Sequence, residues 1–188
     1  LLVPATGQVS IDYIATRDFA RRPLTWLKLI SENRGTLAYS PTFGYELCVK
    51  RMRGDTDFSG DLSSWRGAGI GGDMVQDTIL RRFSETFAPF GFQHKAFVPS
   101  YGMAEVCLAI TFCPHDTGVR TDAVDRTALA ETQRAVPAAD PNDQSRARRF
   151  VICGSVLPGH RLEVRGPDGA VLADREVGRI FVSGPSIM

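Results

Sequence analysis

Strand-like and helix-like segments alternate through the first half of the chain, and this order constrains the fold more than any other feature. The patterns predict helices at 23–33, 42–52 and 73–88, and strands at 36–39, 66–70 and 95–98. Asp73 is the expected N-cap of the third helix. A core-facing stripe recurs along that helix at Val75, Ile79, Leu80, Phe83 and Phe87. Such alternation is typical of a layered α/β fold, a mostly parallel sheet flanked by helices.

The chain changes character after this region. Residues 114–149 are polar, with one short helix predicted at 125–132, and so long an insertion with little structure is usually functional or mobile. The turn sequence 166–169 separates strand candidates at 161–165 and 170–173, and another strand is predicted at 178–183. We therefore predict an α/β subdomain at 1–157, with a polar insertion at about 117–145, and the start of a small antiparallel β subdomain at 158–188.

Composition and charge exclude several classes of protein. Hydrophobic residues make up 43% and charged residues 23% of the chain, and the formal net charge is +1. No strong attraction to nucleic acid or to a membrane surface is therefore expected. Because no segment could span a bilayer or act as a signal peptide, we expect no membrane insertion and a cytoplasmic location. Both ends look cut, which predicts a fragment of a larger protein.

The cysteines do not predict a metal centre. Cys48, Cys107, Cys113 and Cys153 are scattered, and no pair has the spacing of zinc ligands. Cys107 and Cys153 lie in apolar runs, so we expect buried thiols there. The segment 113–116, with its Cys and His, could be a metal or catalytic pair, but it opens a polar loop.

The segment Pro99–Glu105 is the strongest candidate site. It lies between apolar runs at 95–98 and 106–110, which predicts a strand, a tight turn and a buried segment behind it. An aromatic face on Tyr101, a Gly102 that lets backbone approach a ligand, and a fixed carboxylate on Glu105 suit a nucleotide with its metal ion. A surface loop without a ligand is the competing interpretation.

Three glycines offer another interpretation. Gly67, Gly69 and Gly72 have the spacing of a dinucleotide-binding fingerprint, which would favour a Rossmann dehydrogenase or a methyltransferase. That function requires a buried strand before the glycines and an acidic residue about twenty positions after them. The preceding segment 61–65 is not a buried β run, so this remains the weaker alternative.

Taken together, five segments resemble the fatty acyl-AMP ligases of the adenylate-forming superfamily, over nearly the whole chain. They are Ala15–Leu27, similar to a substrate loop with Pro-Leu-x-Trp-Leu; Ser40–Cys48, similar to the acyl-pocket helix; Gly71–Met74, similar to the segment along the adenine; Tyr101–Glu105, similar to the core motif; and Gly178–Ser186, similar to a strand of the β subdomain. The order and spacing of these segments carry the resemblance, since no single motif is decisive.

The resemblance implies ATP and Mg²⁺ as cofactors, and a fatty acid and an acyl carrier protein as partners. It implies that Tyr101 stacks on the adenine and that Glu105, the one catalytic residue in this chain, holds Mg²⁺. Ala104 stands where many relatives have a Thr that bonds the α-phosphate. The implied cofactor-binding residues are Gly71, Gly72, Asp73, Ser100, Tyr101, Gly102, Met103 and Ala104, of which 71–73 act mainly through backbone. Phe43, Tyr45 and Met103 would shape the acyl tunnel, with ordinary core packing as the competing interpretation for the aromatics.

The implied activity is activation of a fatty acid with ATP to an acyl-adenylate, for transfer to a carrier protein of a polyketide or nonribosomal peptide synthase. The segment Thr117–Ser145 stands where these ligases carry an insertion thought to restrict the movement that admits coenzyme A. The phosphate loop, the ribose-binding Asp and the catalytic Lys fall outside this chain, so we predict that it is inactive alone. The alternatives are part of an acyl-CoA synthetase, with an incidental insertion, or a noncatalytic nucleotide-binding or carrier-docking module.

Overall fold

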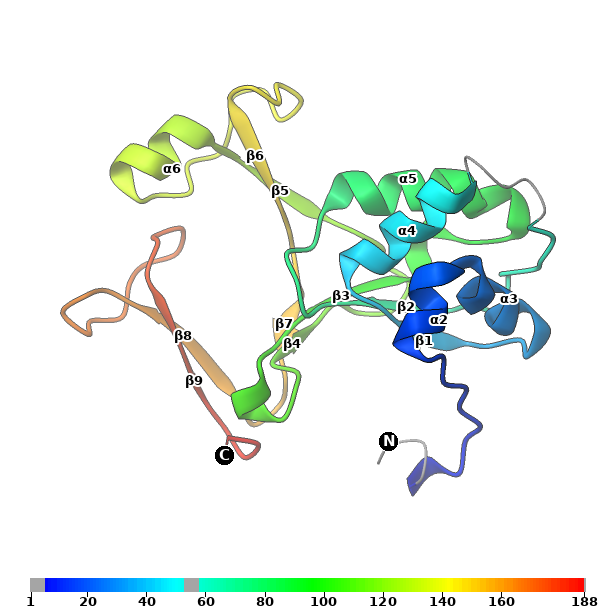
Figure 1. The fold of residues 1–188 in the computed structure, drawn as a ribbon. Coiled ribbons are helices and arrows are strands. Elements are labelled where there is room, and N and C mark those ends of the chain that lie inside the picture. The colour runs from blue at the N-terminus through cyan, green and yellow to red at the C-terminus, as the bar shows by residue number, and fades with distance from the viewer. Residues whose placement is uncertain (1–5, 53–57, 188) are drawn as a thin grey trace.

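A five-stranded sheet organises the chain in the computed structural model, which describes residues 6–52 and 58–187 (Figure 1). Its strand order is β1-β2-β3-β4-β7. The strands β1 (Leu37–Tyr39), β2 (Gly67–Ile70) and β3 (Phe97–Tyr101) are parallel, whereas β4 (Thr111–Phe112) and β7 (Ser155–Val156) add in antiparallel fashion. The predicted α/β class, with small antiparallel sheets beside the main one, is confirmed.

Helices cover the parallel half of the sheet. They are α2 (Thr16–Arg21), α3 (Leu24–Glu32), α4 (Thr42–Met52) and α5 (Asp77–Phe87), with short 3-10 turns η1 (Ala88–Phe90) and η2 (His94–Ala96) leading into β3. The helices predicted at 23–33 and 42–52 and the strands predicted at 36–39 and 66–70 are confirmed. The third helix begins four residues later than predicted, because Gln76 and not Asp73 is its N-cap. The third strand extends through Tyr101, so Pro99–Tyr101 belongs to a strand and not to a turn.

Aromatic side chains build the core between these helices and the sheet. Phe83 and Phe87 of α5, the predicted stripe, are fully buried with Trp65 and Phe97. Edge-to-face contacts join Phe83 to Tyr45 at 5.0 Å and to Phe92 at 5.0 Å between ring centroids. Buried aromatic side chains contribute large apolar areas and fixed geometry, so this cluster holds α4 and α5 on the sheet.

The glycines of β2 serve the packing of the sheet. Gly67 and Gly69 lie within the strand, where an added Cβ would meet the side chains of Leu37 and Tyr39 on β1. The helix α5 begins only at Asp77, so these glycines do not form a turn that leads directly into a helix N-terminus. The dinucleotide-binding interpretation is therefore wrong for this strand.

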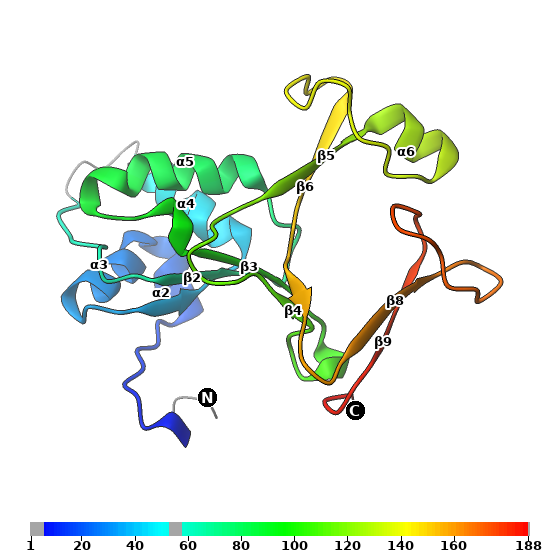
Figure 2. The ribbon, with the colours of Figure 1, turned by 180° about the vertical axis from the view of Figure 1, so that it is seen from behind.

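The predicted insertion is more ordered than the sequence indicated. It forms an antiparallel pair of β5 (Thr121–Asp125) and β6 (Ala147–Val151), with α6 (Arg126–Thr132) directly after β5. The Asp125 side chain accepts a hydrogen bond from the Ala128 N–H at 2.9 Å and so caps the helix that was predicted at 125–132. This part of the chain extends away from the layered region in both views (Figure 2).

The last part of the described chain is a second antiparallel pair. Strand β8 (Arg161–Arg165) pairs with β9 (Arg179–Ser183) along its whole length, from Arg161 opposite Ser183 to Arg165 opposite Arg179. The strand predicted at 170–173 is wrong: only an isolated bridge joins Val171 to Arg165. The predicted turn at 166–169 exists, and Gly169 adopts the left-handed conformation that favours glycine.

Candidate functional site

A cavity of about 360 Å³ opens beyond the carboxyl ends of two neighbouring parallel strands. Two segments supply most of its wall, the loop that follows β2 and the segment 100–102 at the end of β3. The lining residues are Gly72, Asp73, Met74, Val75, Ser100, Tyr101, Gly102, Phe150, Val151 and Cys153. Ligands of open α/β sheets bind at this edge, and the volume lies within the range of small-molecule sites.

The backbones of these two segments approach each other closely. A Cβ on Gly71 would lie 2.8 Å from the Ser100 Oγ, and that hydroxyl donates a hydrogen bond to the Ile70 carbonyl at 3.0 Å. Gly72 has a φ of +79°, and an added Cβ there would meet nothing within 4 Å. Glycine is therefore needed at 71 for packing and at 72 for its conformation, which leaves backbone facing the cavity.

Asp73 lies at the cavity but caps a different helix from the one predicted. Its Oδ1 accepts a hydrogen bond from the Thr42 N–H at 3.1 Å, at the start of α4, and the Thr42 hydroxyl donates to the Met74 carbonyl at 3.3 Å. A carboxylate at a helix N-terminus satisfies a free N–H and interacts favourably with the helix dipole. The Asp73 carboxylate thus fastens the 71–74 loop to α4.

Glu105 lies on the nine-residue loop 102–110 between β3 and β4. The loop begins at the cavity-lining Gly102 and contains the 3-10 turn η3 (Ala104–Val106), in which Glu105 is exposed. Its carboxylate is a hard oxygen donor that fits Mg²⁺, an ion commonly held by one or two carboxylates together with nucleotide phosphates. Within the described ranges, no group of three His, Cys, Asp or Glu side chains forms a metal cluster.

The three residues predicted for the acyl tunnel separate in space. Tyr45 is fully buried in the aromatic core, where its hydroxyl donates to the Gly69 carbonyl at 3.0 Å. Burial, with smaller effects of Cys48 and Tyr39, raises the pKa of the Tyr45 hydroxyl well above its usual value. Phe43 is 51% exposed at the start of α4, and Met103 is half-buried on the Glu105 loop. None of the three lines the 360 Å³ cavity.

Comparison with known proteins places the chain in a family. The family model described as "AMP-binding enzyme" matches residues 9–188. The chain belongs to the AMP-binding enzymes. It is 51% identical over its full length to a Caulobacter vibrioides protein named "Putative acyl-CoA synthetase", of which it covers 32%. It is 33% identical over its full length to a medium-chain-fatty-acid–[acyl-carrier-protein] ligase of Moorena producens, again covering 32%.

Solved structures of AMP-binding enzymes share the fold. A fatty acyl-adenylate ligase, from work on the Escherichia coli and Legionella pneumophila enzymes, matches with a TM-score of 0.93 and 45% identity over all of this chain and 34% of the other. The L. pneumophila ligase in complex with acyl adenylate and pyrophosphate matches with a TM-score of 0.90 and 29% identity, over 99% of this chain and 32% of the other. The chain thus spans about a third of the length of these proteins.

Residues that follow the insertion of this AMP-binding chain contribute part of the cavity that the sequence did not predict. Phe150, Val151 and Cys153 line the cavity from the end of β6 and the residues after it. Their apolar run signalled regular structure, but the sequence did not indicate that β6 passes the 71–75 loop. An ion pair between Arg149 Nε and Asp77 Oδ2, at 3.2 Å, ties β6 to the start of α5.

The insertion is also fastened to the segment between β8 and β9. The Ala135 N–H donates to the Arg175 carbonyl at 2.8 Å, and the Val177 N–H donates to the Gln133 carbonyl at 2.9 Å. Two ion pairs reinforce this contact, Arg134 with Glu176 at 3.2 Å and Arg175 with Asp122 at 3.1 Å. We call these contacts between 133–136 and 173–177, with Asp122, the clamp.

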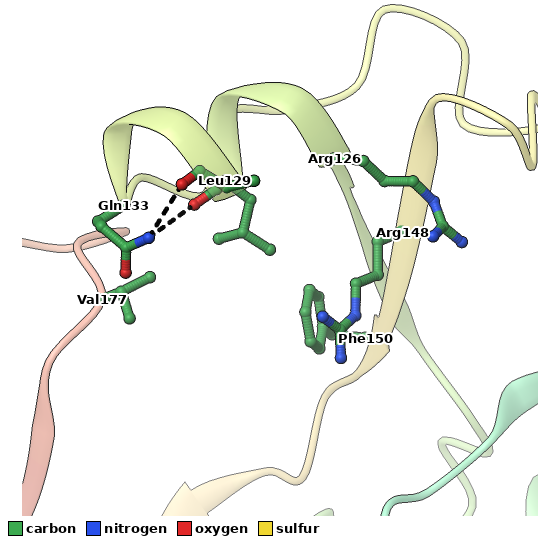
Figure 3. A pocket seen from close by; sticks show the side chains of 7 residues that line it. Arg126, Leu129, Gln133, Arg148, Phe150 and Val177 are labelled. Carbon is green, nitrogen blue, oxygen red and sulfur yellow. Dashed lines mark hydrogen bonds between the residues drawn. The ribbon is translucent and has the colours of Figure 1, made fainter.

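A second cavity, of about 550 Å³, lies between α6, β6 and the clamp (Figure 3). Figure 3 shows the Arg148 guanidinium lying against the Phe150 ring, 4.7 Å from its centroid, while Leu129 and Gln133 come from the helix. The Gln133 amide donates to the Leu129 and Ala130 carbonyls, so it closes the end of α6. The lining contains no carboxylate or thiol, and the sequence did not predict this cavity.

The cysteines differ from their predicted environments. Cys107 is exposed, because the run 106–110 is a loop between strands in which only Val106 and Ile110 are buried. Cys153 is half-buried, while Cys48 and Cys113 are buried. Burial raises the pKa of the Cys48 thiol to about 12. In the described part of the chain, no helix has the length and apolarity needed to cross a membrane.

Proposed function

We propose that this chain is the part of a fatty acyl-AMP ligase that holds the adenine and the metal ion of ATP. The proposal includes the division into an α/β subdomain at 1–157 and the start of a β subdomain at 158–188. The observation that supports it most is the 360 Å³ cavity. Two segments about thirty residues apart, each matched to a nucleotide-binding motif of the family, both contribute to its wall, Gly72 and Asp73 from one and Ser100–Gly102 from the other.

Each residue receives a role that suits its chemistry. The Tyr101 ring stacks on the adenine, while 71–73 approach its other side through backbone, since the Asp73 carboxylate is engaged with α4. Met103 and Ala104 follow Gly102 on the loop that leads to Glu105, which offers one carboxylate oxygen to Mg²⁺. Phe43 and Met103 guide the acyl chain. The contacts of Tyr45 are those of a core residue, so it supports β2 through the Gly69 carbonyl and does not touch substrate.

The reaction joins two anions. A fatty carboxylate oxygen attacks the α-phosphorus of ATP, the new carboxyl–phosphate bond forms, and the bond to the bridging oxygen breaks so that pyrophosphate leaves with the electron pair. Mg²⁺, when bound, neutralises phosphate charge, and such electrostatic stabilisation is the main catalytic contribution available. Because this chain supplies only Glu105 toward it, we expect the chain alone to form no acyl-adenylate.

The acceptor of the acyl group is proposed to be a carrier protein of a polyketide or nonribosomal peptide synthase in the cytoplasm. This part of the proposal rests on the insertion. The clamp supports this part of the proposal, because an insertion fastened at 133–136 could restrict a moving domain better than a free loop could. The name of the Moorena producens relative points to the same acceptor. The 51% identical relative is named for acyl-CoA synthesis instead, which makes an acyl-CoA synthetase the second candidate.

The test uses the full-length protein that contains this chain. It is incubated with ATP, Mg²⁺ and a medium-chain fatty acid, with and without coenzyme A, and the products are measured by mass spectrometry. Acyl-AMP that persists with coenzyme A present supports the ligase, whereas acyl-CoA supports the synthetase. A protein that forms neither product is a noncatalytic module.

A matched pair of variants tests the site itself. Tyr101→Ala should weaken ATP binding about fivefold or more, since stacking on a base contributes about 1–3 kcal/mol. Tyr13→Ala removes an equally large ring that is 63% exposed and distant in sequence from both segments, and should leave ATP binding unchanged. Equal effects of the two substitutions would contradict the assignment of Tyr101.

A further inference from the structure

The loop that carries Glu105 is closed at its base and fastened at its far side. At the base, the Ile110 N–H donates to the Tyr101 carbonyl at 2.9 Å, and a Cβ on Gly102 would lie only 1.6 Å from the Leu108 oxygen. Inside the loop, the Cys107 N–H donates to the Ala104 carbonyl at 3.0 Å, and Cys107 itself adopts a left-handed φ of 64°. These bonds fix the backbone of the short turn from which the Glu105 side chain extends.

Ser186, near the end of the described chain, contacts this turn and also His160. The Ser186 Oγ lies 3.2 Å from the Val106 carbonyl, to which it donates, and 2.6 Å from the His160 Nε2. The Cys107 thiol also reaches the Ser186 carbonyl at 3.5 Å. In both ribbon views, the short green helix between β3 and β4 lies beside the adjoining ends of β8 and β9 (Figures 1 and 2).

A serine hydroxyl has one proton, and a backbone carbonyl can only accept. The His160 Nδ1 lies 3.3 Å from the Pro158 carbonyl, so the contacts of the ring do not by themselves fix its tautomer. With the Ser186 hydroxyl donating to Val106, its oxygen accepts from the tautomer that carries a proton on Nε2. This assignment yields a continuous chain from the imidazole through Ser186 to the backbone of the residue after Glu105.

The strand pair β8–β9 presents these two side chains together. Arg161 and Ser183 are partners at the end of the ladder, so His160 and the residues after Ser183 continue from the same end. A Cβ on Gly184 would lie 2.3 Å from the His160 ring, so the imidazole lies directly against the backbone there. The β8–β9 pair thus holds the His160 and Ser186 side chains together against the loop that carries Glu105.

We propose that Ser186 and His160 are positioning residues for Glu105. They fix the 3-10 turn through the Val106 carbonyl and so hold the Glu105 carboxylate where the metal ion of the nucleotide would bind. The role assigned to Glu105 rests on the proposed function, whereas the fastening of the loop does not. The β8–β9 pair then contributes to the nucleotide site without touching the nucleotide.

The first experiment measures amide hydrogen exchange of the 102–110 peptide in the full-length protein. Ser186→Ala should raise exchange of this peptide about threefold to tenfold, as expected for losing a hydrogen bond. Ser186→Thr keeps the hydroxyl and should restore protection, and His160→Gln, which keeps a donor near Nε2, should protect better than His160→Ala. Thr86→Ala removes a hydroxyl that bonds only within α5 and is the control.

The second experiment measures the Mg²⁺ concentration that gives half-maximal acyl-adenylate formation, and the KM for the fatty acid. Ser186→Ala should raise the Mg²⁺ requirement severalfold with little change in that KM, and Ser186→Thr should reverse the shift. Unchanged exchange in Ser186→Ala would overturn the fastening. Raised exchange with an unchanged Mg²⁺ requirement would overturn the positioning role. A wild type that forms no acyl-adenylate would overturn the proposed function and with it the positioning role, while the exchange result would still decide the fastening.

Discussion

The layered region and the arm of β5, α6, β6, β8 and β9 are held together by different forces. The first buries a continuous aromatic cluster, including Trp65, Phe83 and Phe97. The second buries few large side chains. It is held by the backbone hydrogen bonds of two antiparallel strand pairs and by the clamp, which includes two ion pairs. Apolar burial is the larger and less salt-sensitive contribution, so the arm should open at much lower free energy than the layered region.

Removing one ring from each region should have the largest effect and gives the most direct test of this difference. Phe83→Ala removes a fully buried ring that contacts Tyr45, Trp65 and Phe92, and should lower the free energy of unfolding by about 3–5 kcal/mol. Phe181→Ala removes a ring that is 45% exposed on β9 and should cost about 1 kcal/mol or less. Urea unfolding followed by circular dichroism measures both, and similar losses would contradict the division.

Alkaline pH should destabilise the layered region through its buried acids. The pKa of Cys48 lies at about 12 in the fold against an ordinary value of 9.0, so between these values the unfolded chain loses the proton first. Stability is therefore complete below pH 9 and falls as pH rises toward 12, by up to about 1.4 kcal/mol per pH unit. Burial raises the pKa of Tyr45 as well, which acts in the same direction.

The measurement compares urea unfolding at pH 8.5 and pH 10.5. Wild type should lose clearly more stability than Cys48→Ala over this interval, although Cys48→Ala starts from a lower value. Cys107→Ala removes an exposed thiol and should keep the wild-type slope. Parallel pH dependence in wild type and Cys48→Ala would show that the buried thiol does not titrate as stated.

Asp73 connects the site with the layered region, and its replacement should have an intermediate effect. Asp73→Ala leaves the Thr42 N–H without its acceptor and should cost about 1 kcal/mol, as for loss of a helix cap. Asp73→Asn keeps an acceptor oxygen and should cost clearly less. Chemical unfolding measures both variants, and a loss as large for Asn as for Ala would rule out the capping role.

Asp73 also illustrates which parts of the fold the sequence could predict. The stripe of α5 was recognisable because its residues recur at helical spacing and all face one core. The capping of α4 by Asp73 was not recognisable, because Asp73 lies at the start of one predicted helix while its actual partner, Thr42, lies 31 residues upstream. A local pattern fixes a helix, but it does not say which of two nearby helix ends a side chain will meet.

The candidate site divides in the same way. The motif residues of the two segments could be matched from sequence, and five of the predicted cofactor-binding residues, Gly72, Asp73, Ser100, Tyr101 and Gly102, line one cavity. Phe150, Val151 and Cys153 could not, because their contribution depends on β6 pairing with β5 across an insertion of polar residues. Cys107 was expected to be buried because its neighbours in sequence are apolar. In the structure only Val106 and Ile110 of this loop are buried, and Cys107 is exposed.

The clamp should show the smallest effect and the strongest dependence on salt. Asp122→Asn breaks the pair with Arg175 at the surface and should cost only about 0.2–1 kcal/mol, because exposed ion pairs contribute little. The backbone bonds from Ala135 and Val177 remain, so the clamp should loosen without opening. Hydrogen exchange of the 133–136 and 173–177 peptides measures this directly.

Salt separates the charge of the clamp from its backbone bonds. In wild type, exchange of these two peptides should rise between 50 mM and 1 M NaCl, since the Debye length falls to about 3 Å at 1 M. Asp122→Asn should already exchange faster at low salt and respond less to added salt. Glu46→Gln, which breaks the exposed pair with Lys50 on α4, should change neither peptide. If exchange of the wild-type clamp peptides did not change with salt, the backbone hydrogen bonds alone would hold the insertion. The arm would then differ from the layered region in buried area and not in the kind of force.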